Sequence, residues 1–464
     1  MKEYTSVIAA VSTPPGKGGV AIIRLSGMGA IDIADSLFKP KNKKSFKDSA
    51  PRMQVYGDII HRGEYLDDGM ATLFKSPNSY TGEEMVEISC HGGVTVTSLI
   101  LEALIECGAT YAGKGEFTRR AFINGKLTLT EAEAIGNLLE AKTREQVKLS
   151  SGSSRTLLAK SIEEIREGLT SVLSSLYARI DYPDEDLGDF TSEESANMLE
   201  EISDKIRKLL STYKTGKAIS EGVKTVICGR TNVGKSSLYN LLLGKDAAIV
   251  TDIEGTTRDV LNTTLPLGRV LLDLSDTAGV RDFSLVDTVE AIGIERSLRH
   301  INEAELIIPV FDYSLPLAND DLLLIDRVCT LESPKIAVVN KCDLERGIEI
   351  DFIRKKFDTV IELSAKSGDI SGVESLRTEV EKLFTDEKIS TGHDAIISSA
   401  RQNAELSLAF SYLEDAISAL RGGMPIDVSS SDIERALGEI AELDGKAVTD
   451  TVVANIFSKF CVGK

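Results

Sequence analysis

The sequence has 464 residues, of which 42% are hydrophobic and 27% are charged. A chain of this length and composition can bury several cores and is too apolar for wholesale disorder, so we expect roughly three packed domains. The 53 lysines and arginines against 72 aspartates and glutamates give a formal net charge of −19, which excludes a surface that is basic throughout. Any contact with RNA would need a local basic patch.

The spacing of the cysteines and the length of the apolar runs indicate the cellular compartment of the protein. Six cysteines occur without a Cys-x-x-Cys pair and four histidines are present, so closely spaced zinc ligands are missing and reduced thiols are expected. The apolar stretch 7–11 is shorter than a signal-peptide core, and no uninterrupted apolar run reaches the roughly 18 residues of a membrane span. We expect a cytoplasmic protein.

Two groups of basic residues are candidates for contact with RNA. One has five lysines between Lys39 and Lys47, and the other contains Arg119, Arg120 and Lys126. Charged runs of this kind are more often solvated faces. Both interpretations are open at this stage.

Up to about residue 118, short apolar runs alternate with turn residues. A strand at 20–25 and a helix at 95–105 indicate an α/β or an α+β domain. From Thr130, with Glu133 three residues later as its capping partner, the pattern becomes helical. Apolar positions then recur every three or four residues between 158 and 180, on one stripe of a long helix that needs a partner helix.

Helical segments lie on both sides of a region in which strands and helices alternate. Thr191 and Glu194 form the next capping pair, and helical periodicity returns at 395–420 and restarts at Ser431 with Glu434. The strands predicted between these helices occupy 223–228, 270–274, 306–311, 335–339 and 359–363. This rhythm is typical of a parallel sheet, so we expect an α/β domain inserted into one helical domain.

The segment from Gly229 to Ser236 matches the phosphate-loop pattern G-x-x-x-x-G-K-[ST], between a predicted strand and a predicted helix. Backbone N–H groups of such a loop wrap phosphates, Lys235 reaches the β and γ phosphates, and the Ser236 hydroxyl ligates magnesium. A chance match occurs in about a few per cent of chains this long. Further motifs are needed to distinguish a nucleotide-binding loop from a chance match.

Those further motifs follow later strands of the same region. Residues 276–279 (Asp-Thr-Ala-Gly) offer a carboxylate for the magnesium shell and an N–H for a γ-phosphate, and residues 340–343 (Asn-Lys-Cys-Asp) and 364–366 (Ser-Ala-Lys) end the next strands. Carboxyl ends of parallel strands meet at one edge, so all these motifs can converge on one nucleotide. Asp343 can accept from the ring N–H and the amine of guanine, a donor pair that adenine lacks. We predict GTP as the ligand; the alternative is a degenerate or inactive nucleotide fold.

A segment between the phosphate loop and Asp276 is the expected first switch. Residues 251–259, called the switch segment below, can bring a threonine hydroxyl to magnesium. The residue after Gly279 is Val280, so the glutamine that positions water in many regulatory GTPases is missing. Arg281, Asp282 and Glu290 are candidates for that work.

The predicted nucleotide-binding residues come from the phosphate loop, the switch segment and the strand-end motifs. They are Asn232, Val233, Gly234, Lys235, Ser236, Ser237, Thr251, Asp252, Ile253, Glu254, Gly255, Thr256, Thr257, Asp276, Thr277, Ala278, Gly279, Asn340, Lys341, Asp343, Ser364, Ala365 and Lys366. Among them, Ser236 and Thr257 are the predicted magnesium ligands.

Together these features resemble the family of tRNA-modification GTPases MnmE, also called TrmE. The match covers essentially the whole chain: the Thr-Pro-Pro-Gly-Lys-Gly-Gly loop at 13–19, the stretches 76–87, 91–93 and 115–126, the inserted GTPase motifs and the Cys-Val-Gly-Lys sequence at 461–464. The GTPase motifs alone fit many families. Their combination with the Cys-Val-Gly-Lys sequence is much more specific.

The resemblance agrees with the fold class expected from the elements. It implies an α/β P-loop GTPase domain inserted into an all-α helical domain and preceded by an α+β N-terminal folate-binding domain. The expected bounds are 1–119 for the folate-binding and dimerisation domain, 120–218 and 385–464 for the two halves of the helical domain, and 219–384 for the GTPase domain.

For function, the resemblance implies a homodimer that joins the FAD-dependent subunit MnmG in a heterotetramer and acts on tRNA. The two proteins would add a carboxymethylaminomethyl group, or with ammonium an aminomethyl group, to C5 of the wobble uridine (position 34) of certain tRNAs. The one-carbon donor would be 5-formyl- or 5,10-methylenetetrahydrofolate. The alternative is a ribosome-assembly or signalling GTPase that works as an RNA- or protein-binding switch, and affinity for folate distinguishes the two.

Four residues would contact the folate by similarity: Arg24, Glu87, Lys126 and Lys464. Without the family match they are ordinary surface or ion-pair residues. Cys461 would be a functional cysteine near the folate, and its role as nucleophile, acid or packing residue is open.

For hydrolysis, the resemblance implies that potassium takes the place of an arginine finger. The ion would be held by Asn232 and by Thr251, Ile253 and Thr256 of the switch segment, where a fixed cation stabilises charge developing on the phosphates. Glu290 matches the water-orienting glutamate of the family. With Lys235 and Cys461 it completes the predicted catalytic residues.

Overall fold

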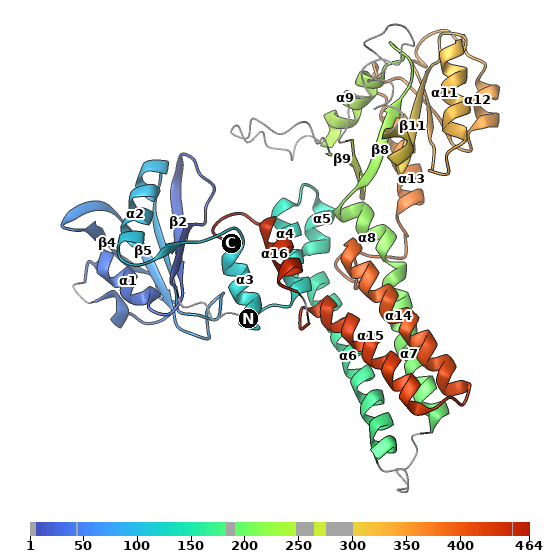
Figure 1. Cartoon of the computed structure of the whole chain (residues 1–464). Coiled ribbons are helices and arrows are strands. Elements are labelled where there is room, and N and C mark those ends of the chain that lie inside the picture. Colours follow the sequence, from blue (N-terminus) through green and yellow to red (C-terminus); the bar gives the residue numbers. More distant parts are fainter. Residues whose placement is uncertain (1–5, 43–44, 182–190, 247–263, 275–299, 448) are drawn as a thin grey trace, which may run out of the picture. The chain divides into compact units, whose positions relative to one another are not determined.

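The computed structural model describes residues 6–42, 45–181, 191–246, 264–274, 300–447 and 449–464 (Figure 1). The chain divides into two compact units, one formed by Met1–Leu139 with Ile440–Lys464 and the other by Glu140–Glu439. Among the helices of the described residues, none is both long and apolar enough to span a membrane. The predicted domain bounds stay a prediction.

A seven-stranded sheet forms most of the first unit. Its strands, in spatial order, are β3 (Phe38–Pro40), β4 (Val55–His61), β5 (Glu64–Phe74), β6 (Met85–Gly92), β2 (Gly18–Ser26), β1 (Ile8–Val11) and β7 (Thr110–Tyr111). Neighbouring strands are antiparallel except β1 and β7. The predicted α+β character of this region is confirmed.

The two faces of this sheet differ in burial. Ile23 and Leu25 of β2 and Ile88 of β6 pack into one core with residues of α1 (Ala30–Leu37) and α2 (Val94–Glu106). Side chains alternate along a strand, so Arg24 and its cross-strand neighbour Glu87 lie on the opposite face. There they are only partly exposed.

Residues 461–464 pack against the strands and turns of the first unit. They follow α16 (Asp450–Ser458), which shares a core with α4 (Leu129–Glu140). The Ser12 hydroxyl donates to the carbonyl of Gly463 at 2.9 Å, and the Phe117 N–H donates to the carbonyl of Lys464 at 3.1 Å. Gly463 has a φ of 94°, and a Cβ there would lie 2.5 Å from the carbonyl oxygen of Val11. The backbone of 461–464 is therefore closely fitted to its site.

The helices of the second unit confirm part of the predicted pattern. Those outside the inserted domain are α5 (Arg144–Ser150), α6 (Gly152–Asp181), α7 (Ser192–Ser211), α8 (Tyr213–Ser220), α14 (Ala400–Arg421) and α15 (Ile426–Asp444), whose last residues belong to the first unit. The stripe of α6 is buried from Leu158 to Leu176 and packs against α7, while Ile180 beyond it is exposed. The capping pair Thr191 and Glu194 opens α7 as predicted.

Two predicted helix starts were wrong. At α4 the capping pair is Thr128 with Glu131: the Thr128 N–H donates to the Glu131 carboxylate, and the Glu131 N–H donates to the Thr128 hydroxyl. The Thr130 hydroxyl instead donates to the carbonyl of Leu443. The start predicted at Ser431 falls inside α15, because that helix already begins at Ile426. In both places the threonine or serine and the glutamate three residues later lie within the helix, so this sequence pattern alone does not mark a helix start.

The inserted domain has a six-stranded sheet with helices on both faces. In spatial order the strands are β13 (Val360–Leu363), β12 (Ala337–Asn340), β11 (Leu306–Asp312), β8 (Val223–Cys228), β10 (Val270–Asp273) and β9 (Thr264–Leu267). All neighbours are parallel except β9 and β10. One face packs against α9 (Lys235–Asp246) and α13 (Ile370–Phe384), and the other against α11 (Asn319–Cys329) and α12 (Ile350–Lys356).

Arg120 belongs to one of the two basic groups that the sequence offered for RNA contact. It lies on α3 (Glu116–Ile123), and its side chain is 0% exposed. The guanidinium donates to the carbonyl of Ser6 at 2.9 Å and forms ion pairs with Glu83 at 3.2 Å and Glu116 at 3.0 Å. Neither a surface patch nor a solvated face describes this arginine, because it is a structural cation of the first unit.

We expect Arg120→Ala to lower the free energy of unfolding by about 3–5 kcal/mol, because it leaves the two carboxylates without their counter-charge. Urea unfolding followed by circular dichroism measures this change. The control is Arg62→Ala, since Arg62 is 74% exposed and pairs with Glu106 at 3.1 Å. Its expected effect is below about 1 kcal/mol, and equal stability of the two variants would contradict the structural role.

Candidate functional site

The phosphate loop connects β8 to α9, as the sequence predicts. Asn232 and Gly234 have φ angles of 63° and 99°, in the left-handed region. A Cβ on Gly234 would lie 2.1 Å from Nδ2 of Asn340. Glycine is therefore required at 234 both by its backbone conformation and by the close approach of Asn340.

Lys235 lies at the centre of this loop. Its side chain is buried, and Nζ donates to the carbonyl oxygens of Gly229 at 2.9 Å and Arg230 at 2.8 Å. Ser236 and Ser237, the next residues of α9, are exposed. The first turn of this helix therefore presents hydroxyls and helix N–H groups at the loop, an arrangement that favours phosphate binding.

Asn340 connects three of the predicted motifs. It is 2% exposed, and its Nδ2 donates to the carbonyl of Val233 at 2.9 Å. Its Oδ1 accepts from the N–H groups of Lys341 at 2.8 Å and Ala365 at 2.9 Å. The side chain thus holds the phosphate loop and the two loops that are predicted to bind the base together rather than reaching into solvent.

Asp343 is the exposed carboxylate of this edge. Its Oδ1 accepts from the Ser364 hydroxyl at 2.5 Å, and this hydrogen bond, with the nearby Lys366 and Lys341, lowers the pKa of Asp343. The carboxylate is therefore ionised at neutral pH and can accept from the N–H and amine of guanine. Its geometry fits the predicted base specificity.

A further ion pair at this edge was not predicted. Lys341, with a φ of 70°, contacts Asp312 through Nζ and Oδ2 at 2.5 Å. Asp312 ends β11, and its backbone is paired with that of Asn340. The signal available in the sequence was its place at the end of an apolar strand.

The other half of the predicted site lies outside the described residues. It comprises Thr251, Asp252, Ile253, Glu254, Gly255, Thr256, Thr257, Asp276, Thr277, Ala278, Gly279 and Glu290, together with the other candidates for positioning water, Arg281 and Asp282, and with Val280 at the place of the missing glutamine. The structure therefore brings together the residues of the phosphate loop and those predicted to bind the base. The positions of the switch segment and of the water-orienting group stay predictions.

Three of the four predicted folate residues come together in the first unit. Arg24 Nε pairs with Glu87 Oε1 at 2.8 Å, and the guanidinium lies 5.9 Å from the centre of the Tyr80 ring. Burial and the neighbouring Arg24 lower the pKa of Lys464. Lys126 instead donates to the carbonyl of Pro77 at 3.2 Å, near the loop that carries Tyr80.

The exposed Cys461 is held near the same place through its backbone. The carbonyl of Cys461 accepts from the N–H of Gly115 at 3.3 Å, and the thiol is close enough to interact electrostatically with Lys464. The structure thus places the predicted functional cysteine beside the residues of the predicted folate site.

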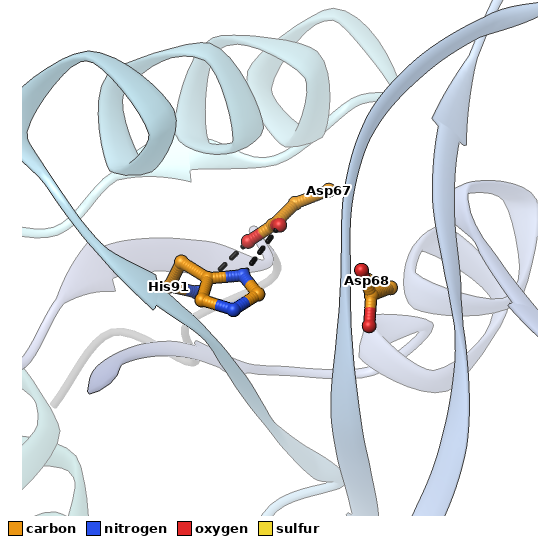
Figure 2. Close-up of side chains that lie close together, drawn as sticks. All are labelled: Asp67, Asp68 and His91. Atoms are coloured by element: carbon orange, nitrogen blue, oxygen red, sulfur yellow. Dashed lines mark hydrogen bonds and ion pairs between the residues drawn. The ribbon is translucent and has the colours of Figure 1, made fainter. Parts of the chain in front are cut away.

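Asp67, Asp68 and His91 form a separate cluster on β5 and β6 (Figure 2). Asp67 accepts from the ring Nδ1 of His91 at 2.7 Å and from its backbone N–H at 2.8 Å. The ring hydrogen bond and the charge of Asp67 raise the pKa of His91. Asp68 accepts from the hydroxyls of Tyr56 and Tyr65, each at 2.7 Å. Both carboxylates thus have protein donors, and we assign no ion to the cluster.

We expect Gly234→Ala to abolish detectable binding of GTP and GDP, because an added methyl group would displace Asn340 and strain the loop. Fluorescence titration with a labelled guanine nucleotide measures binding. The control is Gly244→Ala in α9, where a Cβ meets nothing within 4 Å. Binding by Gly234→Ala as tight as that by the control would show that nucleotide binding does not require the close approach of Asn340 to residue 234.

Comparison with known proteins agrees with this arrangement. The family model for the MnmE helical domain matches residues 129–461, and that for the GTP-binding protein TrmE N-terminus matches 7–126. The chain is 40% identical over 460 residues to the tRNA modification GTPase MnmE of Thermotoga sp. (strain RQ2), covering 98% of this chain and 99% of that protein. It is 37% identical over 459 residues, with the same coverage, to that of Clostridioides difficile (strain 630).

A solved structure of Era in complex with MgGDPNP and nucleotides of 16S ribosomal RNA matches 52% of this chain and 99% of that chain, at 17% identity and a TM-score of 0.28.

The predicted fold class is confirmed: an α/β P-loop GTPase domain inserted into an all-α region and preceded by an α+β domain. The chain belongs to the MnmE family of tRNA modification GTPases.

Proposed function

We propose that this GTPase, with an FAD-dependent partner, adds a carboxymethylaminomethyl group to C5 of the wobble uridine (position 34) of certain tRNAs. The one-carbon unit would come from 5-formyl- or 5,10-methylenetetrahydrofolate. The observation that carries this proposal is the packing of residues 461–464 beside the Arg24 and Glu87 pair. It brings Lys464 together with Arg24 and Glu87, three of the four predicted folate residues, with Cys461 next to them.

The charges of this site fit a folate. Arg24 and Lys464 are two cations close to each other, and their proximity together with burial lowers the pKa of Lys464. A bound anion would offset that repulsion, and the tail of a folate carries carboxylates. Glu87 can accept hydrogen bonds from the N–H donors of a pterin, and Tyr80 offers a flat ring beside Arg24. The tetrahydrofolate, when bound, supplies the one-carbon unit.

For GTP hydrolysis we propose Mg²⁺ and K⁺ as cofactors. Ser236 and Thr257 would hold Mg²⁺, and Asn232 with Thr251, Ile253 and Thr256 would hold K⁺, which supplies positive charge at the phosphates. Supporting observations are that Ser236 is exposed at the start of α9 and that Asn232 is exposed on the outer turn of the loop. Glu290 would orient the attacking water.

We also propose a cytoplasmic homodimer that joins MnmG in a heterotetramer. Support comes from the sheet face of the first unit that α1 and α2 leave open. Tyr56 on that face is 49% exposed, and an exposed aromatic ring of this kind suits a protein partner.

We expect the double variant Arg24→Ala/Glu87→Ala to lose binding of 5-formyltetrahydrofolate, because it removes one cation and the carboxylate of the site. Equilibrium dialysis against this folate measures the loss. In cells lacking the gene, the variant should also fail to restore the wobble-uridine modification, which nucleoside mass spectrometry of tRNA detects.

The matched control is Arg62→Ala/Glu106→Ala, which removes an exposed cation and carboxylate pair elsewhere in the same unit. It should bind folate and restore the modification like the unaltered protein. Normal folate binding by Arg24→Ala/Glu87→Ala would contradict the site. Unaltered wobble uridines in cells lacking the gene would contradict the assigned reaction and favour the RNA- or protein-binding switch.

Potassium should raise the rate of GTP hydrolysis, because Val280 stands where many regulatory GTPases have a glutamine and a fixed cation must stabilise the developing charge. Initial rates in buffers of equal ionic strength with K⁺ or Na⁺ measure this effect, and Asn232→Ala should remove the difference. Equal turnover of the unaltered protein in both buffers would refute the role of K⁺.

A further inference from the structure

A buried carboxylate on α11 lies next to the phosphate loop and has no role in the site described above. Asp321, in the first turn of this helix, is 3% exposed. Its Oδ2 accepts from the N–H of Ala318 at 3.0 Å, and its Oδ1 has no hydrogen-bond partner among the described residues. An ionised group in such a place is costly unless a cation stands near it.

The cation comes from the phosphate loop itself. Nε of Arg230 lies 3.3 Å from Oδ2 of Asp321, and the arginine side chain is only 21% exposed. Burial raises the pKa of Asp321, as do the neighbouring Asp320 and Asp312, and Arg230 acts in the opposite direction. The pair therefore links the loop to a helix that packs on the sheet core.

The backbone of Arg230 carries this link to the phosphate-binding lysine. Nζ of Lys235 donates to the Arg230 carbonyl at 2.8 Å. The side chain of Arg230 is held by Asp321 while its carbonyl holds Lys235, so one residue connects α11 to the ammonium that meets the phosphates. A shift of Arg230 would move that carbonyl and the start of the loop together.

We propose that Asp321 is a positioning residue for GTP hydrolysis: through Arg230 it holds the phosphate loop in the shape that receives the nucleotide. A loop that is ordered before binding loses less conformational freedom when the nucleotide arrives. The pair should therefore act on affinity for the nucleotide in ground state and transition state alike. This role is independent of the folate and tRNA chemistry.

The test is steady-state GTP hydrolysis by the full-length variant Asp321→Asn. The amide can still accept from the Ala318 N–H, so the helix cap is kept while the charge is lost. We expect KM for GTP to rise about tenfold and kcat to stay within about twofold, the pattern of lost uniform binding. A carboxylate needed only for folding would instead reduce the amount of active enzyme, which lowers apparent kcat and leaves KM unchanged.

A second variant tests whether Asp321 acts through Arg230. Arg230→Met should raise KM to a similar extent, and the double variant should be no worse than either single variant, because both remove the same link. The control, Glu362→Gln, removes a carboxylate that pairs with Arg354 on the same domain and should leave KM unchanged. An unchanged KM in Asp321→Asn, or fully additive effects in the double variant, would overturn the proposal.

Discussion

The nucleotide site depends on one buried amide. Asn340 ends a central parallel strand, and its side chain joins the phosphate loop at Val233 to the loop at Ala365. Both ends of an amide are needed for this, since Nδ2 donates on one side and Oδ1 accepts on the other. A carboxylate in its place would put an acceptor against the carbonyl of Val233, and a shorter side chain would leave buried backbone groups unpaired. The requirement for glycine at 234 follows from the same contact.

The hairpin of β9 and β10 ties this site to the helical region of the same unit. It lies between the switch segment and Asp276 in the sequence, and both the start of its first strand and its turn contact other elements. Nζ of Lys142 donates to the Thr264 hydroxyl at 3.0 Å, and at the turn Arg269 contacts Glu381 of α13 at 2.8 Å through its N–H. The Arg269 guanidinium also donates to the carbonyl of Ile389 at 2.7 Å, in the segment that leads to α14. The two strands that lie between the switch segment and Asp276 in the sequence are thus anchored by Lys142 and Glu381 from outside the sheet and by the guanidinium of Arg269.

Features that depend on local residue patterns could be predicted from the sequence, whereas features that depend on packing between elements were missed. The phosphate loop and the strand-end motifs were predictable, because a parallel sheet sends all of them to one edge. The strand β9 was missed because it has four residues, one of them Pro266, which an edge strand tolerates. The burial of Arg120 and the link from Asp321 to Arg230 come from segments far apart in the sequence. Glu116, four residues before Arg120, was a local signal for an ion pair but not for burial, because i,i+4 pairs are ordinary on exposed helix faces.

Asp312 and Asp343 lie at the same sheet edge, and their different hydrogen-bond partners suit them to different roles. Asp312 is buried; burial alone would raise its pKa, yet Lys341 and Ser314 outweigh that effect and the pKa is lowered. Its charge is neutralised within the protein, so it serves structure. Asp343 is exposed, and its hydrogen-bond partner Ser364 is a neutral hydroxyl, which orients the carboxylate without cancelling its charge. The charge predicted to select guanine is therefore available because its partner is a hydroxyl, whereas a lysine in that place would compete with the base for the same oxygens.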